Sequence, residues 1–103
     1  MLPWTLLMGE DRMKFMVTWE IAPAHMPTAV ARFLETGGAP PKGVKMLGRW
    51  HGTGLGFALA ECKDGKALFD WMAQWSDQIE LAVHPVVEDR DGAAVLRRVY
   101  KGR

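Results

Sequence analysis

Two apolar segments separated by a glycine-rich turn constrain the fold of this chain more than any other feature. The segments are Val44–His51 and Leu55–Cys62, and Gly52-Thr53-Gly54 lies between them. Glycine reaches positive φ without the steric cost of a Cβ atom, so a short turn of this composition favours a β-hairpin. We therefore predict a hairpin over residues 43–62. Its first strand contains three consecutive side chains that could bind or react with a ligand, Arg49-Trp50-His51.

Two further strands are predicted from alternation of side chains. Residues 13–21 alternate Phe, Val and Trp with Lys, Met, Thr and Glu, and residues 79–87 show a similar alternation. A period of two with β-branched and aromatic residues is typical of a strand. Pro85 lacks the N–H that a central strand must donate. The last strand is therefore expected at an edge of the sheet, or with a bulge.

Helices are predicted where apolar residues recur at intervals of three and four. These segments are Pro27–Glu35, ended by two glycines, and Lys66–Trp75, for which Asp64 is a possible N-cap. A short terminal helix is expected over residues 93–101. The element order is then β-α-β-β-α-β with a C-terminal helix, which is the ferredoxin-like α+β plan around a four-stranded antiparallel sheet. Right-handed crossovers put both central helices on one face of this sheet.

The face of the sheet that no helix covers indicates how the chain associates. Both faces carry apolar side chains, which we group as Phe15, Val17, Leu55 and Phe57 on one and Met16, Ala58, Ala60 and Val86 on the other. Four strands of about five residues give a footprint of roughly 300 Å². Burying that area stabilises by about 8 kcal/mol per subunit, before the costs of association. We expect a homodimer packed sheet to sheet.

Composition narrows the classes of protein. The 103 residues suffice for one domain, expected over residues 13–103, with residues 1–12 as an N-terminal arm. The net charge is +1 without a basic stripe, so nucleic acid is not an expected partner. No apolar run reaches the ~18 residues of a membrane span, and the single cysteine fits a reducing compartment, so we expect a cytoplasmic protein. Five Trp and seven Met are many for so small a body and suggest a ligand cavity or a partner subunit.

Several strings resemble a bacterial family, domain of unknown function 3303. They are FMVTWEI, ARFLETGGAPPKGVKMLGRWH, GFALAE, ALFDWMAQWSD and VHPVVED, and together they span about residues 13–96. That family is similar to the dimeric α+β barrel superfamily, which includes antibiotic-biosynthesis-type monooxygenases, isomerases and cyclases. The resemblance implies a dimer and a cavity between sheet and helices. It carries over no catalytic residue, and fold analogy does not license a reaction.

Arg49 and His51 are the candidate catalytic residues. Strand alternation points them to one face and Trp50 to the other. His51 is the candidate base, because histidine exchanges protons near neutral pH, and Arg49 is the candidate partner of an oxyanion or carboxylate. The alternative is structural, with Arg49 paired to Glu61 across the hairpin and His51 hydrogen-bonded at the end of the sheet. The sequence does not decide which face lines the cavity.

The candidate ligand-binding residues are aromatic or histidine. Tryptophans supply large, flat walls for an apolar ligand, although they also serve as core. The three histidines have no spacing typical of metal ligands, so no metal site is expected, and no cofactor is expected either. The predicted set is Trp19, Trp50, Trp71, Trp75, His84 and His25.

Three functions remain open at this stage. The first is a cofactor-independent enzyme, of isomerase, cyclase or monooxygenase type, acting on an apolar or aromatic metabolite. The second is a binding or stress-responsive module without turnover. The third is a structural dimer whose interior is filled by its own Trp and Met side chains.

Overall fold

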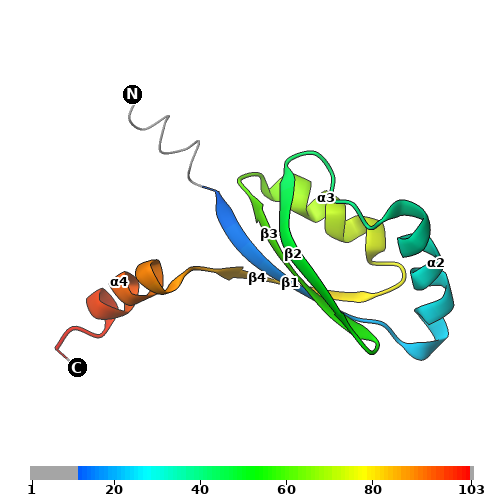
Figure 1. Ribbon diagram of the computed structural model, residues 1–103. Coiled ribbons are helices and arrows are strands. Elements are labelled where there is room, and N and C mark those ends of the chain that lie inside the picture. Colours follow the sequence, from blue (N-terminus) through cyan, green and yellow to red (C-terminus); the bar gives the residue numbers. More distant parts are fainter. Residues whose placement is uncertain (1–11, 103) are drawn as a thin grey trace.

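The structure is a computed structural model that describes residues 12–102, and its strands and helices follow the predicted order (Figure 1). The predicted N-terminal arm lies outside the described residues except for Arg12. The elements are β1 (Met13–Glu20), a 3-10 turn η1 (Pro23–His25), α2 (Met26–Thr36), β2 (Val44–Gly52), β3 (Leu55–Cys62), α3 (Gly65–Trp75), β4 (Glu80–Val86) and α4 (Asp89–Val99).

The four strands form one antiparallel sheet in the order β2-β3-β1-β4. This order confirms the ferredoxin-like α+β plan, and it places Pro85 on an edge strand, as predicted. Helices α2 and α3 lie on the same side of the sheet (Figure 1). Thr53 and Gly54 form the hairpin turn, and the carbonyl of Gly54 accepts a 2.8 Å hydrogen bond from the N–H of Ile21. The hairpin tip is thereby tied to the end of β1.

The helix ends show the expected capping. Asp64 caps α3, since its Oδ1 accepts a 2.9 Å hydrogen bond from the N–H of Lys66. Gly37 ends α2 in the left-handed conformation, at φ 72°, where a Cβ atom is unfavourable. The terminal helix begins at Asp89, four residues before the predicted start. Acidic residues in its first turn and arginines in its last complement the helix dipole and support that start.

The pairing of β1 with β3 corrects the predicted grouping of faces. Phe15 lies opposite Ala60 and Val17 opposite Ala58, so these four residues share the face that the helices cover. Phe57 and Leu55, which were predicted to share a face with Phe15 and Val17, lie on the other face. The prediction failed because alternation fixes faces within a strand but not between strands. The buried core is Val17, Ala29, Val44, Ala58, Ala60, Cys62, Leu68 and Trp71.

The face opposite the helices exposes aromatic side chains. Trp50 is 58% exposed and Phe57 is 44% exposed, and the two lie opposite each other on β2 and β3. Helix α4 projects beyond the end of β4, apart from α2 and α3 (Figure 1), and none of its residues is buried. No helix in the described part of the chain is both long and apolar enough to cross a membrane.

Candidate ligand-binding pocket

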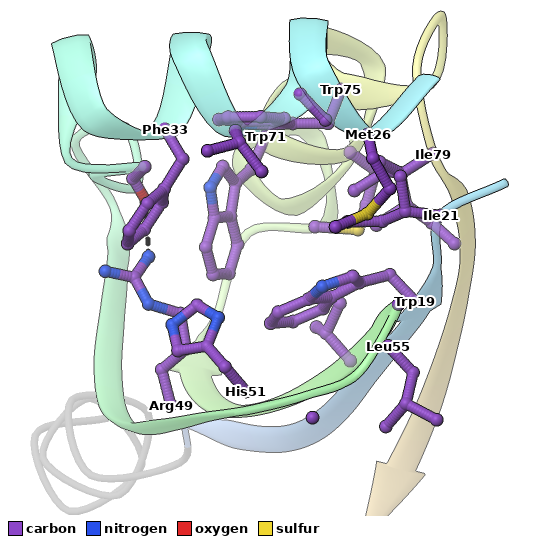
Figure 2. Close-up of a pocket in the computed structure, with 18 residues that line it drawn as sticks. Trp19, Ile21, Met26, Phe33, Arg49, His51, Leu55, Trp71, Trp75 and Ile79 are labelled. Atoms are coloured by element: carbon purple, nitrogen blue, oxygen red, sulfur yellow. Dashed lines mark hydrogen bonds between the residues drawn. The ribbon is translucent and has the colours of Figure 1, made fainter. Parts of the chain in front are cut away.

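A cavity of about 270 Å³ lies between the sheet and helices α2 and α3 (Figure 2). It is roughly twice the ~150 Å³ apolar cavity that holds benzene in an engineered protein. Its walls are mainly apolar. The lining residues are Val17, Trp19, Ile21, Met26, Ala29, Val30, Phe33, Gly38, Arg49, His51, Gly52, Gly54, Leu55, Trp71, Met72, Trp75, Ile79 and Leu81.

Three of the four predicted tryptophans line this cavity. Trp19 comes from β1, and Trp71 and Trp75 come from successive turns of α3, so the rings enclose the cavity from the sheet and the helix sides (Figure 2). The ring of Trp19 lies on β3 at Gly56, where an added Cβ would be 2.2 Å from its Cζ2 atom. The absence of a side chain at Gly56 lets the ring lie flat against the sheet and leaves the space above it open.

A β-bulge decides which side chains of β2 reach the cavity. The pairing of β2 with β3 shifts between Met46 and Gly48, so one extra residue is inserted at Leu47. Such a bulge reverses the alternation of side chains beyond it. Arg49 and His51 therefore share a face with Met46 and line the cavity, which settles the choice that the sequence left open.

His51 presents an unpaired imidazole to the cavity. Its ring contacts Trp19 and Phe33 edge to face, with centroid distances of 6.2 and 5.2 Å. Within residues 12–102 it makes no hydrogen bond, in contrast to the predicted structural alternative. The residue is exposed and lies beside Gly52 at the end of β2, so its ring stands at the mouth of the cavity.

Arg49 joins the sheet to the end of α2. Its Nη1 donates to the carbonyl of Gly38 and its Nη2 to that of Gly37, both at 2.9 Å, and the guanidinium lies 4.9 Å from the ring centroid of Phe33. A cation is favourable at the C-terminal end of a helix, where carbonyls lack partners. The predicted alternative pairing with Glu61 is wrong, because Glu61 lies on the opposite face. In Figure 2 the Nε of Arg49 points toward His51 and remains the part of the group nearest the cavity.

A second arginine, Arg32, joins α2 to the end of α3. Arg32 forms a bidentate ion pair with Asp77 at 2.9 and 3.0 Å and donates to the carbonyl of Gln74 at 2.8 Å. Its guanidinium also lies 5.2 Å from the ring centroid of Trp75. The hydrogen bond to Arg32 holds the pKa of Asp77 below its ordinary value of 3.8. Sequence reasoning missed this clamp, because nothing local in the chain relates Arg32 to Asp77.

Three predicted binding residues lie outside the cavity, so their part in binding stays a prediction. Trp50 is on the opposite face of the sheet, where its ring covers Gly48 of its own strand. His84 faces the same way, since it lies opposite Met16 on β4. His25 is exposed at the end of η1 and does not line the cavity. Among the described residues, no group of three or more His, Cys, Asp or Glu is arranged to hold a metal ion.

Comparison with known proteins identifies the family. A family model described as Domain of unknown function (DUF3303) matches residues 13–100. The chain belongs to this family. The match confirms the resemblance seen in the sequence and extends it over nearly all of the described residues.

A comparison with solved structures lists the crystal structure of MupZ from Pseudomonas fluorescens. It is 16% identical, with a TM-score of 0.43, and the alignment covers 87% of this chain and 84% of that one. A comparison with curated proteins found no match.

Proposed function

We propose that the protein is a homodimer that binds a small apolar or aromatic molecule in the cavity between the sheet and helices α2 and α3. The observation that carries this proposal is an open apolar space next to a polar side chain, His51, that has no hydrogen-bond partner among residues 12–102. Ligand sites typically combine apolar walls with a few polar groups that fix orientation. Here three tryptophans form the walls and His51 is the polar group.

The size of the cavity narrows the class of ligand. A volume of about 270 Å³ accommodates a molecule somewhat larger than benzene, such as a bicyclic aromatic. The ligand should carry one oxygen, as a carbonyl, hydroxyl or carboxylate, that reaches the imidazole of His51. A ligand with charge on several sides is disfavoured, because most of the wall offers it no hydrogen bond.

We propose that catalysis, if it occurs, is proton transfer by His51 without a cofactor. The imidazole removes a proton from a carbon next to a carbonyl and returns it at another position of the same molecule. Atoms and electrons balance between substrate and product in such an isomerisation or cyclisation, so no further reactant is required. A monooxygenase reaction would in addition consume dioxygen. The Nε–H of Arg49 is the available donor to the enolate oxygen, which is the kind of interaction that lowers such barriers.

A second candidate is a binding module without turnover. The observation that favours it is the use of Arg49, whose two Nη atoms each donate to a helix carbonyl. A guanidinium committed to holding α2 has fewer N–H groups left for a developing oxyanion. In that case the cavity binds a ligand without converting it, and the contacts of Arg49 and Arg32 that hold α2 in place respond to its presence.

The exposed apolar face of the sheet supports the proposal of a dimer. We also propose that the protein acts in the cytoplasm. Trp50, Phe57 and Leu47 are each more than 40% exposed on or beside this face. An exposed apolar patch of several hundred Å² usually marks an interaction site in a protein of this size. Packing two copies face to face removes these side chains from water.

Native mass spectrometry of the freshly purified protein tests the binding proposal. The expected result is a dimer carrying additional mass of a small organic molecule. The variant Ala29→Leu should lose that mass, because Ala29 is buried against the cavity and a larger side chain fills it. For the enzyme reading, His51→Gln should abolish turnover of the released compound and keep the dimer. Protein without added mass, unresponsive to the compounds tried, would favour the structural dimer.

A further inference from the structure

Two apolar surfaces of the described residues are left uncovered. The first is a stripe on α4 formed by Val95, Leu96 and Val99, which are 48%, 56% and 37% exposed. Their spacing of one, three and four residues puts them on one side of the helix. Arg97, Arg98 and Ala94 lie on the other sides of the helix. An amphipathic helix of this kind is stabilised mainly by packing its apolar side, and the described part of the chain leaves that side exposed.

The second surface is a shallow groove between α3 and the start of β4. It is lined by Phe69, Met72, Ala73, Ser76, Ile79, Glu80 and Leu81. Phe69 is 73% exposed at its rim, although it sits on the helix that carries the buried Trp71. Met72, Ile79 and Leu81 also line the ligand cavity, so the groove is the outer side of that cavity's wall.

The chain's own α4 does not lie on this groove. The groove lies at the Glu80 end of β4, and α4 follows the Val86 end after Val87 and Glu88. Six residue steps from Leu81 to Val87 at ~3.3 Å each separate the two by about 20 Å. Helix α4 continues beyond the Val86 end of β4 and projects away from α3 (Figure 1), so any helix that covers the groove comes from elsewhere.

The α4 helix of a second copy reaches the groove if the two sheets pack face to face with their β4 strands running in opposite directions. In that arrangement the Val86 end of one β4 lies near the Glu80 end of the other. Two sheets packed face to face are about 10 Å apart, and the 11 residues of α4 extend about 16 Å. The helix is therefore long enough to cross from one sheet layer to the α3 side of the other.

Charge favours this orientation. Glu20 and Glu80 lie directly opposite each other on β1 and β4, and within residues 12–102 neither has an ion-pair partner. Like charges in this position destabilise a sheet unless a cation is added. The last turn of α4 carries Arg97 and Arg98. At the other end of the sheet Lys14 and Lys45 flank Glu61, and Lys14 is already paired with Glu88, so the acidic side chains there already have cations beside them.

We propose that α4 of each subunit docks its apolar stripe in the groove between α3 and β4 of its partner and so completes the outer wall of the partner's ligand cavity. This inference rests on the proposed homodimer. It makes the cavity a shared site, because part of its covering comes from the other chain.

Cross-linking tests the contact directly. The double variant Phe69→Cys with Leu96→Cys is treated with a short bismaleimide, and the two single variants are the controls. Native Cys62 is buried and common to all three. The double variant should give a covalent dimer on a denaturing gel, whereas neither single variant should do so. Equal cross-linking in all three, or a link within one chain, would overturn the inference.

Sedimentation of the same proteins separates this inference from the dimer itself. A dimer in sedimentation without the specific cross-link overturns the docking of α4 and leaves the dimer standing. A monomer at micromolar concentration overturns both.

A second readout avoids dependence on cross-linking yield. The rate at which a maleimide dye labels Phe69→Cys should rise at least tenfold when Leu96→Glu is added. Adding Ala94→Glu, which lies off the apolar stripe, should leave the rate unchanged. The same rate in both backgrounds would show that α4 does not cover the groove.

Discussion

The indole ring of Trp19 lies against the backbone of Gly56, so close that a Cβ atom there would be 2.2 Å from the ring. This contact joins β1 to β3 on the face that carries the cavity, and it sets the depth of the space above the ring. Gly56 itself is buried.

Gly56→Ala should therefore destabilise the protein. The methyl group forces the Trp19 ring toward the cavity, and overpacking of this kind costs about 1–3 kcal/mol. Denaturant unfolding measures the loss. Gly65→Ala is the matched control, since an added Cβ at the first residue of α3 meets nothing within 4 Å. Equal stability of the two variants would contradict the close contact at Gly56.

Arg49→Lys should loosen α2 although the charge is kept. A lysine ammonium does not reproduce the fork that reaches the carbonyls of Gly37 and Gly38. Because the group is partly exposed, we expect a loss of about 1–2 kcal/mol in unfolding free energy. Amide hydrogen exchange in α2 should accelerate more than exchange in α3. Uniform acceleration across both helices would contradict a local role for Arg49.

The ion pair between Arg32 and Asp77 should make stability fall in acid. The folded-state pKa of Asp77 is below its ordinary value of 3.8, so the unfolded chain binds the proton first. This contribution is present above the ordinary value and is lost as the pH falls through the lower, folded value. Thermal unfolding from pH 6 down to pH 2 should show a shallower decline for Asp77→Asn. Identical slopes would remove Asp77 from the acid dependence.

The dimer should depend on the face of the sheet away from the helices. Phe57→Glu puts a carboxylate in the proposed interface, and burying an unpaired charge is strongly unfavourable. The variant should sediment as a monomer at micromolar concentration. Leu34→Glu on α2, where the leucine is 75% exposed on the helix side of the sheet, is the control and should remain a dimer. A dimer in both variants would place the interface elsewhere.

Much of the fold is predictable from local patterns. The hairpin turn, the cap at Asp64 and the edge position of Pro85 each depend on one residue's own stereochemistry, and all three are confirmed. The family match is confirmed as well. The start of α4 was predicted too late, because its first turn contains polar residues and Gly92 rather than the apolar spacing used to find helices.

The site was less predictable because non-local pairing forms it. Alternation along β2 correctly separates Trp50 from Arg49 and His51, but the bulge at Leu47 decides which side faces the helices. Gly48 is the one local sign of the bulge, because a glycine inside a strand often marks one, but it does not say which face then turns to the helices. Arg32 and Asp77 are 45 residues apart in sequence, and only the packing of α2 beside α3 brings them together. The roles of His51 and Arg49 in catalysis stay predictions.

Titration with 2-naphthol followed by NMR measures directly whether the cavity takes a small aromatic ligand. The indole N–H signals of Trp19, Trp71 and Trp75 should shift on titration, whereas that of Trp50, on the other face of the sheet, should not. Ala29→Leu fills the cavity and should weaken binding at least tenfold, while Ala31→Leu, at an exposed position on the same helix, should not. Shifts confined to Trp50, or equal binding by the two leucine variants, would show that the ligand does not bind in this cavity.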